Sequence, residues 1–134
     1  MTSVGVQPSG GVVLIVDDDK PIADYVAAVV ADAGYTAVVA TRGAEALELA
    51  RGQWPVLLIT DLMLPFMSGS SLIAALRAAG AEQGRVAPPA ILMTAAGARQ
   101  AQAAGAQAIL SKPFDLSALE ALLARFLGVG VPSP

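Results

Sequence analysis

The chain has 134 residues, of which 55% are hydrophobic and 14% charged, with a formal net charge of −3 and neither histidine nor cysteine. Without imidazole or thiol groups it can form no histidine- or cysteine-based catalytic unit and no ordinary zinc, haem or iron–sulfur site, so any chemistry must rest on carboxylates, lysine, hydroxyls, backbone groups or a hard cation. The eight lysine and arginine residues form no basic stripe, and no apolar run reaches the roughly 18 residues of a membrane span, so we expect neither nucleic acid nor membrane as a direct partner.

The first half of the chain alternates strands with helices. Residues 12–16 (VVLIV) form a continuous apolar run, as expected of a strand covered on both faces. The following residues change to a helical period, for which Pro21 suits the first turn and Gly34 the end. The next helix is expected to be capped by Thr41. We therefore predict a helix at 20–34, a strand at 36–40, a helix at 43–52 and a strand at 56–60.

The second half continues this alternation. A helix at 70–79 precedes a polar, glycine-containing loop and a strand at 90–94. Only a short segment separates that strand from the next one at 106–110, so we expect a shortened fourth helix of at most about two turns. Asp115 is expected to cap a fifth helix. The apolar stripe of this last helix consists of Leu116, Leu119, Leu123 and Phe126.

Five strands alternating with five helices predict an α/β fold with a doubly wound parallel sheet. Right-handed crossovers place the carboxyl ends of all strands at one edge. In the flavodoxin-like strand order 2-1-3-4-5, strands one and three are neighbours, and ligands bind where the order reverses. We expect one domain over residues 11–128, a flexible N-terminal segment at 1–10 and a C-terminal tail at 129–134.

Polar side chains follow the buried strands at this edge. Asp17, Asp18 and Asp61 directly follow strands one and three. Thr94 ends strand four, and Lys112 comes two residues after strand five. Two carboxylates about 4 Å apart repel by on the order of 4 kcal/mol at an effective dielectric near 20, so a cation, a lysine or a raised pKa must offset the repulsion. The set predicts a Mg²⁺-assisted phosphoryl-transfer centre with one carboxylate as nucleophile.

Three nearby side chains have structural interpretations. Asp19 is expected to cap the first helix rather than to bind a ligand. Phe66, in the loop after Asp61, either packs on the edge of the domain or contacts a partner. Trp54 is expected to be a packing residue.

Four segments, in this order, resemble the receiver domain of bacterial two-component response regulators: VLIVDDD, TDLMLPFMSG, ILMTA and LSKPF. The resemblance covers about residues 11–128. It implies a phosphorylatable signalling receiver that accepts a phosphoryl group on Asp61 from a phosphohistidine in a Mg²⁺-dependent reaction and then switches its protein–protein contacts. Apart from phosphorylation and dephosphorylation of its own aspartate, it implies no enzymatic activity.

The resemblance also assigns roles to single residues. Thr94 matches the switch hydroxyl, Lys112 the lysine that pairs with the phosphoryl group, and Ala95 the small residue that gives this group access. Where the family has Tyr or Phe, three positions before the lysine, this chain has Ile109. The ligands implied for Mg²⁺, or for Mn²⁺ in its place, are Asp17, Asp18, Asp61 and the backbone carbonyl of Met63.

The absence of histidine requires the phosphodonor to be a separate molecule: a sensor histidine kinase, a histidine phosphotransfer protein or a small phosphodonor. We expect a cytoplasmic monomer or weak dimer, either stand-alone or part of a longer protein, whose downstream target the sequence does not identify. One alternative is an atypical receiver that is never phosphorylated and acts as a constitutive binding module. The other is a haloacid-dehalogenase-type phosphatase, with Asp17 as nucleophile and Asp19 as acid–base.

Overall fold

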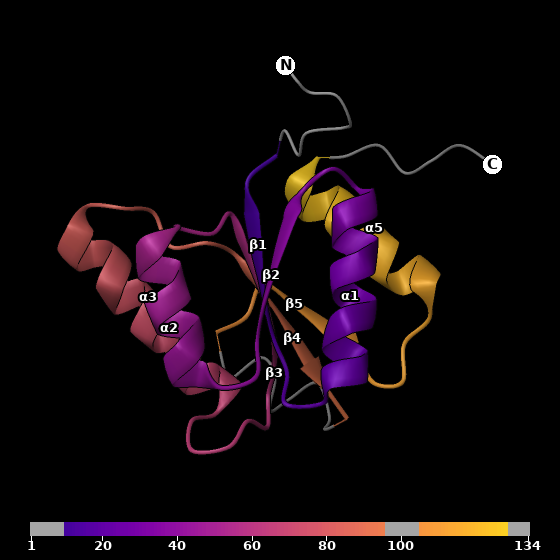
Figure 1. The fold of residues 1–134 in the computed structure, drawn as a ribbon, viewed down its shortest axis with the longest axis horizontal. Coiled ribbons are helices and arrows are strands. Elements are labelled where there is room, and N and C mark those ends of the chain that lie inside the picture. Colours follow the sequence, from indigo (N-terminus) through magenta and orange to yellow (C-terminus); the bar gives the residue numbers. More distant parts are fainter. Residues whose placement is uncertain (1–9, 96–104, 129–134) are drawn as a thin grey trace.

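The structure of the chain, a computed structural model, describes residues 10–95 and 105–128. Strands and helices alternate along them. In chain order they are β1 (Val12–Val16), α1 (Lys20–Asp32), β2 (Thr36–Ala40), α2 (Gly43–Gly52), β3 (Leu57–Asp61), α3 (Gly69–Gln83), β4 (Ala90–Thr94), β5 (Ala108–Ser111) and α5 (Leu116–Leu127). The strands form one parallel sheet of five, in the order β2-β1-β3-β4-β5 (Figure 1). The predicted flavodoxin-like strand order is therefore confirmed.

The number of helices differs from the prediction. Residues 10–95 and 105–128 contain four helices, not five. The short helix expected between β4 and β5 falls on residues 96–104, which lie outside the described part of the chain. The other four predicted helices, at 20–34, 43–52 and 70–79 and after Asp115, are all present.

Two segments have bounds that differ from the prediction, because their ends depend on particular hydrogen bonds. Helix α3 begins earlier, since the hydroxyl of its N-cap Ser68 accepts a hydrogen bond from the backbone N–H of Ser71 at 3.1 Å. It ends later, at Gln83, and its C-cap Gly84 has a left-handed φ of 66°. Strand β3 lies one residue later than predicted: it begins at Leu57 rather than at residue 56, and it includes Asp61, because the pairing with β4 continues through that residue.

Side-chain caps explain where two other helices begin. Asp19 accepts from the N–H of Ile22 at 3.4 Å, and Asp115 accepts from the N–H of Ala118 at 2.9 Å. Both predicted caps are confirmed. The cap predicted at Thr41 is wrong: α2 begins after Arg42, and no side chain caps it.

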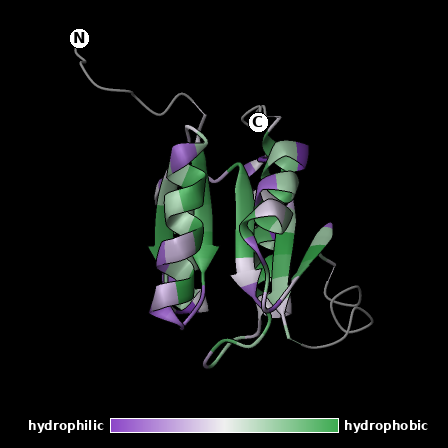
Figure 2. Ribbon diagram, turned by 90° about the vertical axis from the view of Figure 1, so that its right-hand side faces the viewer, coloured by the Kyte–Doolittle hydropathy of each residue, from purple (hydrophilic) through white to green (hydrophobic). Residues whose placement is uncertain are grey.

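The core forms two layers, one on each face of the sheet. Every residue of β1, β3 and β4 is buried. Helices α2 and α3 pack on one face, and α1 and α5 pack on the other (Figure 1). The strands are almost uniformly hydrophobic, whereas the helices mix hydrophobic and hydrophilic residues (Figure 2). In α5 the buried stripe is Leu119 and Leu123, while Leu116 is 45% exposed.

Strand register aligns the carboxyl ends of the strands at one edge. Val16 is paired with Thr60, Asp61 with Met93, and Thr94 with Ser111. Because parallel strands all end at this edge, the polar residues that follow them are brought together. Among the described helices, none has the length and apolar character needed to span a membrane.

Candidate functional site

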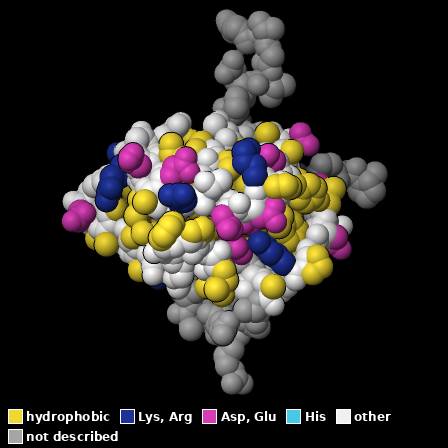
Figure 3. Space-filling view, turned by 60° about the horizontal axis from the view of Figure 1, so that its bottom comes forward, with side chains coloured by type: hydrophobic (Ala, Val, Ile, Leu, Met, Phe, Trp, Pro, Cys, Tyr) yellow, Lys and Arg dark blue, Asp and Glu magenta, His cyan; other side chains and the backbone are white. Residues whose placement is uncertain are grey.

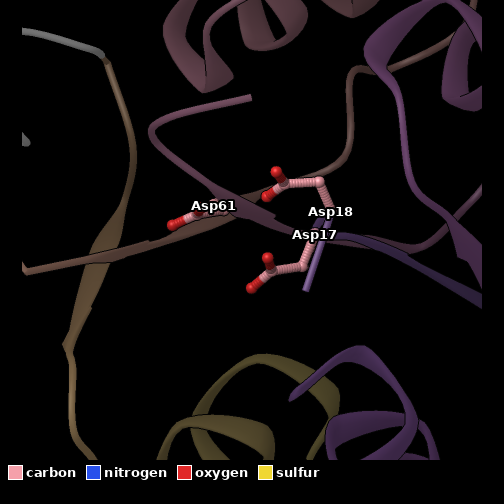
Figure 4. A group of neighbouring side chains, drawn as sticks. All are labelled: Asp17, Asp18 and Asp61. Atoms are coloured by element: carbon pink, nitrogen blue, oxygen red, sulfur yellow. The ribbon is translucent and has the colours of Figure 1, made fainter. Parts of the chain in front are cut away.

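Three carboxyl groups meet where β1 and β3 end. Asp17 and Asp18 follow β1, and Asp61 is the last residue of β3. One oxygen from each group lies within 4.8 Å of the other two, and Figure 4 shows the three side chains together at the ends of neighbouring strands. Asp17 is fully buried and Asp61 is 8% exposed, whereas Asp18 is exposed. The sheet thus gathers negative charge at a site in which Asp18 is the exposed carboxylate.

Lys112 connects two of these carboxylates. Its Nζ donates to Asp17 Oδ2 at 2.9 Å and lies 3.2 Å from Asp61 Oδ1. The Lys112 side chain is 19% exposed, so this ammonium is largely withdrawn from water. Three carboxylates and one ammonium leave the site with an excess of negative charge, which a further cation would offset.

Burial and neighbouring charges act differently on the pKa values of Lys112 and Asp61. Burial lowers the pKa of the Lys112 ammonium, but its hydrogen bonds with Asp17 and Asp61 outweigh burial and raise the pKa above the usual range. Burial, together with the charge of Asp17, raises the pKa of the Asp61 carboxyl, although the contact with Lys112 opposes this shift. Asp61 is therefore a more basic carboxylate than an exposed aspartate.

Asp17 is held by both of its oxygens. Oδ1 accepts from the backbone N–H of Asp19 at 2.9 Å, and Oδ2 accepts from Lys112. This orientation follows from the tight connection between β1 and α1, because Asp19 is also the N-cap of α1. Asp17 is thus a fixed, buried anion, and Asp18 beside it faces outward.

The remaining predicted residues lie at the same edge. Thr94 ends β4 and is 2% exposed, and Ala95, which follows it, is exposed. The backbone N–H of Lys112 donates to the Thr94 carbonyl at 2.9 Å, which ties the end of β5 to the end of β4. Met63 lies two residues after Asp61, with 74% of its side chain exposed.

Ile109 packs inward from β5. It is half-buried against the core cluster on the α2–α3 face, and its partner in the sheet is Leu92. An aliphatic residue therefore takes the position at which the resemblance implied an aromatic ring.

Phe66 does not pack on the edge of the domain, so that interpretation is wrong. Its side chain is 93% exposed, and its φ of 66° is rare for a residue other than glycine. The only aromatic or cation–π contact seen for it within the described residues is the Arg42 guanidinium, 5.5 Å from the ring centroid. Trp54, by contrast, is half-buried against the core, as predicted, and donates to the Val86 carbonyl at 2.9 Å.

Gly69 keeps the start of α3 close to the end of β3. Its N–H donates to the Leu62 carbonyl at 2.8 Å, and a Cβ here would collide with the Asp61 carbonyl oxygen and approach Leu92 Cδ1 to 3.0 Å. We expect Gly69→Ala to lower the free energy of unfolding by about 1–3 kcal/mol, as overpacking typically does. Chemical denaturation measures this loss.

Gly52→Ala is the matched control for that substitution. Gly52 is the last residue of α2, and a Cβ there would meet nothing within 4 Å. Alanine is also the better helix former, so this variant should be as stable as the wild type or slightly more stable. Equal losses in the two variants would contradict the role given to the contact between Gly69 and Asp61.

An open cavity adjoins the site, and it was not foreseen from the sequence. It measures about 480 Å³, and Ala95 and Lys112, the lysine that pairs with Asp17 and Asp61, belong to its lining. Its other lining residues are Pro21, Ile22, Tyr25, Pro113 and Phe114. The signal that could have revealed it is an aromatic residue directly after Lys112-Pro113, combined with Ile22 and Tyr25 three positions apart on the first turns of α1.

The carboxylate cluster fits a hard divalent cation. Mg²⁺ and Mn²⁺ prefer oxygen ligands, and Mg²⁺ commonly takes one or two carboxylates with waters and a phosphate oxygen. The cluster provides such oxygens: one carboxylate oxygen from each of Asp17, Asp18 and Asp61 lies within 4.8 Å of the other two. Because one lysine accompanies three carboxylates, the remaining negative charge favours the binding of a cation.

Comparison with known proteins gives a consistent picture. Residues 13–124 match the family described as the response regulator receiver domain. The chain is 34% identical over 119 residues to the DNA-binding transcriptional regulator NtrC of Escherichia coli. This alignment covers 86% of this chain and 24% of NtrC. It is also 34% identical over 117 residues to the response regulator MprA of Mycobacterium ulcerans, in an alignment that covers 84% of this chain and 47% of MprA. The chain thus spans a quarter to a half of the length of these relatives.

Solved structures are similar over nearly the whole chain. The chemotaxis response regulator CheY4 of Vibrio cholerae matches with a TM-score of 0.78 and 31% identity, covering 89% of this chain and all of that one. The receiver domain of the Francisella response regulator 1452 matches with a TM-score of 0.70 and 29% identity, covering 87% of this chain and 93% of that one.

Proposed function

Because this chain belongs to the receiver domain family of response regulators, we propose that it accepts a phosphoryl group on Asp61 and changes its protein contacts in response. The phosphodonor is a phosphohistidine on a sensor histidine kinase or a histidine phosphotransfer protein, since the chain has no histidine of its own. The reaction takes place in the cytoplasm, and the downstream target is a protein.

The observation that supports this proposal most is the position of Lys112 between Asp17 and Asp61. An ammonium 3.2 Å from Asp61 Oδ1 can pair with the oxygens of a phosphoryl group attached to that carboxylate. The second partner, fully buried Asp17, keeps the ammonium charged and in place. Asp61 and Lys112 therefore offer a nucleophile and a cationic partner for the incoming phosphoryl group.

Each residue of the site then has a role. Asp61 attacks phosphorus, since it ends β3 at the open edge and burial raises its pKa. Lys112 balances the charge of the incoming group, Thr94 supplies the hydroxyl that responds to it, and exposed Ala95 leaves room for it. Mg²⁺ or Mn²⁺, held by Asp17, Asp18, Asp61 and the Met63 carbonyl, supplies the remaining neutralisation of the phosphoryl oxygens when bound.

The phosphatase alternative has less support. In that interpretation Asp17 is the nucleophile, but Asp17 is fully buried and both of its oxygens accept hydrogen bonds, one from Asp19 and one from Lys112. Asp19, the acid–base in that alternative, caps α1. These contacts favour a ligand-holding function for Asp17 and a structural function for Asp19.

Intact-mass measurement tests the proposal. Incubation with Mg²⁺ and phosphoramidate or acetyl phosphate should add one phosphoryl group to the wild type and none to Asp61→Asn. Asp32→Asn is the matched control, because Asp32 is an exposed aspartate at the end of α1, and it should be phosphorylated like the wild type. No adduct on the wild type would favour the constitutive binding module, and an adduct that persists in Asp61→Asn would move the acceptor to another residue.

Metal binding should stabilise the folded chain. At ten times the dissociation constant, Mg²⁺ is expected to raise the free energy of unfolding by about 1.4 kcal/mol, seen as a higher melting temperature. Asp18→Asn should reduce this shift, since it removes an outward-facing carboxylate from the cluster without leaving Asp17 unpaired. Asp32→Asn should keep the shift, and Mn²⁺ should reproduce it. A shift of equal size with NaCl at the same ionic strength would argue against a specific site.

A further inference from the structure

Thr60, the residue before Asp61, is a buried polar residue among apolar neighbours. It is fully buried, and its partners in the sheet are Val16 of β1 and Leu92 of β4, which both belong to the core cluster on the α2–α3 face. A hydroxyl in such surroundings costs free energy unless it forms a hydrogen bond. Valine has nearly the same shape and would satisfy the packing, so the hydroxyl at this position needs an explanation beyond packing.

The Thr60 hydroxyl binds the backbone of the acceptor residue. It donates to the Asp61 carbonyl oxygen, which lies 3.0 Å from Oγ1. The N–H of the same peptide group belongs to Leu62 and donates to the Met93 carbonyl at 2.9 Å. Both polar groups of this peptide are therefore bound, one to Thr60 and the other to β4. Because a peptide group is planar and rigid, these two hydrogen bonds fix its orientation.

Gly69 lies against the same carbonyl group. The Asp61 carbonyl oxygen is the atom with which a Cβ on Gly69 would collide, so the start of α3 lies directly beside it. The oxygen thus lies between the Thr60 hydroxyl and α3, and removing the hydroxyl would take a donor from a carbonyl group that is enclosed by the fold. A buried acceptor that loses its donor is costly, so the backbone is expected to shift when the hydroxyl is lost.

The carboxylate of Asp61 lies on the other face of β3, since successive residues of a strand point to opposite faces. There it approaches Lys112, with 3.2 Å between Oδ1 and Nζ. In Figure 3, which brings the carboxyl ends of the strands forward, acidic side chains gather around a basic one on this surface. Thr60 is fully buried, so it can affect this surface only through the backbone of Asp61.

We propose that Thr60 is a positioning residue for the acceptor: its hydroxyl holds the peptide that follows Asp61 and so directs the Asp61 carboxylate toward Lys112. This inference rests on the proposed function and extends it to a residue that touches neither the donor nor the phosphoryl group. In the transfer, an Asp61 carboxylate oxygen bonds to phosphorus, and the P–N bond of the donor breaks with its electron pair remaining on nitrogen. Thr60 keeps its proton throughout. A displacement of about 1 Å can slow such a reaction roughly a hundredfold, so a fixed backbone matters here.

Two pairs of side chains at position 60 isolate the hydroxyl. Thr60→Val replaces the hydroxyl of the wild type with a methyl group, and Thr60→Ala lacks the hydroxyl that Thr60→Ser keeps. We would measure the rate constant of phosphorylation by phosphoramidate for each protein, by intact mass after timed quenching. The temperature is kept well below every melting point, and Mg²⁺ is kept saturating according to the affinity measured for each variant, so that only folded, metal-loaded protein is compared.

The rate constant should follow the hydroxyl and not the melting temperature. It should fall roughly tenfold or more from the wild type to Thr60→Val, and by a similar factor from Thr60→Ser to Thr60→Ala, as when a hydrogen bond that orients a ligand or reacting group is lost. Thr60→Ser should react at nearly the wild-type rate, although it loses a buried methyl group and melts at a lower temperature. Thr36→Val is the matched control, because Thr36 begins β2 at the end of the sheet away from the carboxylates, and its rate should equal that of the wild type.

Amide hydrogen exchange gives a second readout that needs neither metal nor donor. The Leu62 N–H belongs to the peptide that Thr60 holds, so without Mg²⁺ it should exchange faster in Thr60→Val and Thr60→Ala than in the wild type and Thr60→Ser. Exchange at the N–H groups of β2, measured in the same samples, corrects for any change in global stability.

Equal rates in Thr60→Ser and Thr60→Ala would overturn the inference while leaving the proposed function intact, and this pair decides the question alone if Thr60→Val does not fold. Unchanged exchange at Leu62 in both variants that lack the hydroxyl would overturn it too, because the peptide would then not depend on Thr60. Failure of the wild type to react with phosphoramidate would instead refute the proposed function, and this inference with it.

Discussion

Lys112→Met is expected to lower the free energy of unfolding by about 3 kcal/mol when measured with a metal chelator present. The substitution keeps the length and apolar stem of the side chain but removes its charge. Fully buried Asp17 and nearly buried Asp61 then face each other without the ammonium that now lies 2.9 Å from one and 3.2 Å from the other. Thermal or chemical denaturation measures the loss.

Lys20→Met is the matched control, because the sequence has only these two lysines. Lys20 pairs with Asp24 at 3.0 Å on the surface of α1, with the lysine side chain 67% exposed. Exposed pairs of this kind contribute about 0–1 kcal/mol, so the stability of this variant should stay close to that of the wild type. Equal losses in the two variants would contradict the role given to Lys112 at the buried carboxylates.

Lys112→Met also separates the effect on stability from the effect on reactivity. We expect Mg²⁺ to stabilise Lys112→Met more than the wild type, because the carboxylates have lost their other cationic partner. Phosphorylation by phosphoramidate should nevertheless be slower by roughly a hundredfold or more, the usual cost of removing one charge partner of the reacting group. If added Mg²⁺ restored stability and rate together, Lys112 would act only by balancing charge in the resting site.

Leu119→Ala is expected to cost about 3 kcal/mol of unfolding free energy, or roughly 10 °C in melting temperature. Leu119 is fully buried in the cluster formed by α1, α5 and the sheet. Removing its side chain takes away apolar burial and leaves a cavity between α5 and the strands. The loss should be seen equally with and without Mg²⁺, because this residue is not part of the site.

Leu116→Ala, one turn earlier in the same helix, provides the comparison. Leu116 is 45% exposed, and alanine is the better helix former, so the expected loss is small. A cost similar to that of Leu119→Ala would mean that α5 packs differently from the arrangement shown in Figure 1.

Local sequence patterns were sufficient for much of the fold. Continuous apolar runs predicted strands at 12–16, 36–40 and 90–94 with their observed bounds, because buried parallel strands have no polar face. Asp19 and Asp115 predicted the starts of α1 and α5, since a carboxylate before a helical period is a strong capping signal. The prediction failed at Thr41, where the side chain that bonds near the helix start is Glu45, which accepts from the Thr41 N–H.

Contacts between distant segments lay beyond such patterns. The helical period of α5 placed Leu116 in the same stripe as Leu119, but only the packing of α5 on α1 and the sheet shows that Leu116 stays 45% exposed. Phe66 could have packed on the domain, and its exposure depends on how the loop after β3 turns. The end of β3 likewise depends on its pairing with β4, which no local signal contains.

For the site, the sequence by itself determined which groups are available: three aspartates and one lysine after apolar strands, and no histidine to act as its own donor. The chemistry of these side chains, and the rule that parallel strands end at one edge, are enough to predict that they share a site. Only the tertiary structure showed that Lys112 contacts both Asp17 and Asp61, at 2.9 Å and 3.2 Å, and that Tyr25 and Phe114 form a cavity beside them. The physical reason is that these contacts join residues up to 95 positions apart, whose distances are set by the packing of α1, α5 and the sheet rather than by any local preference of the chain.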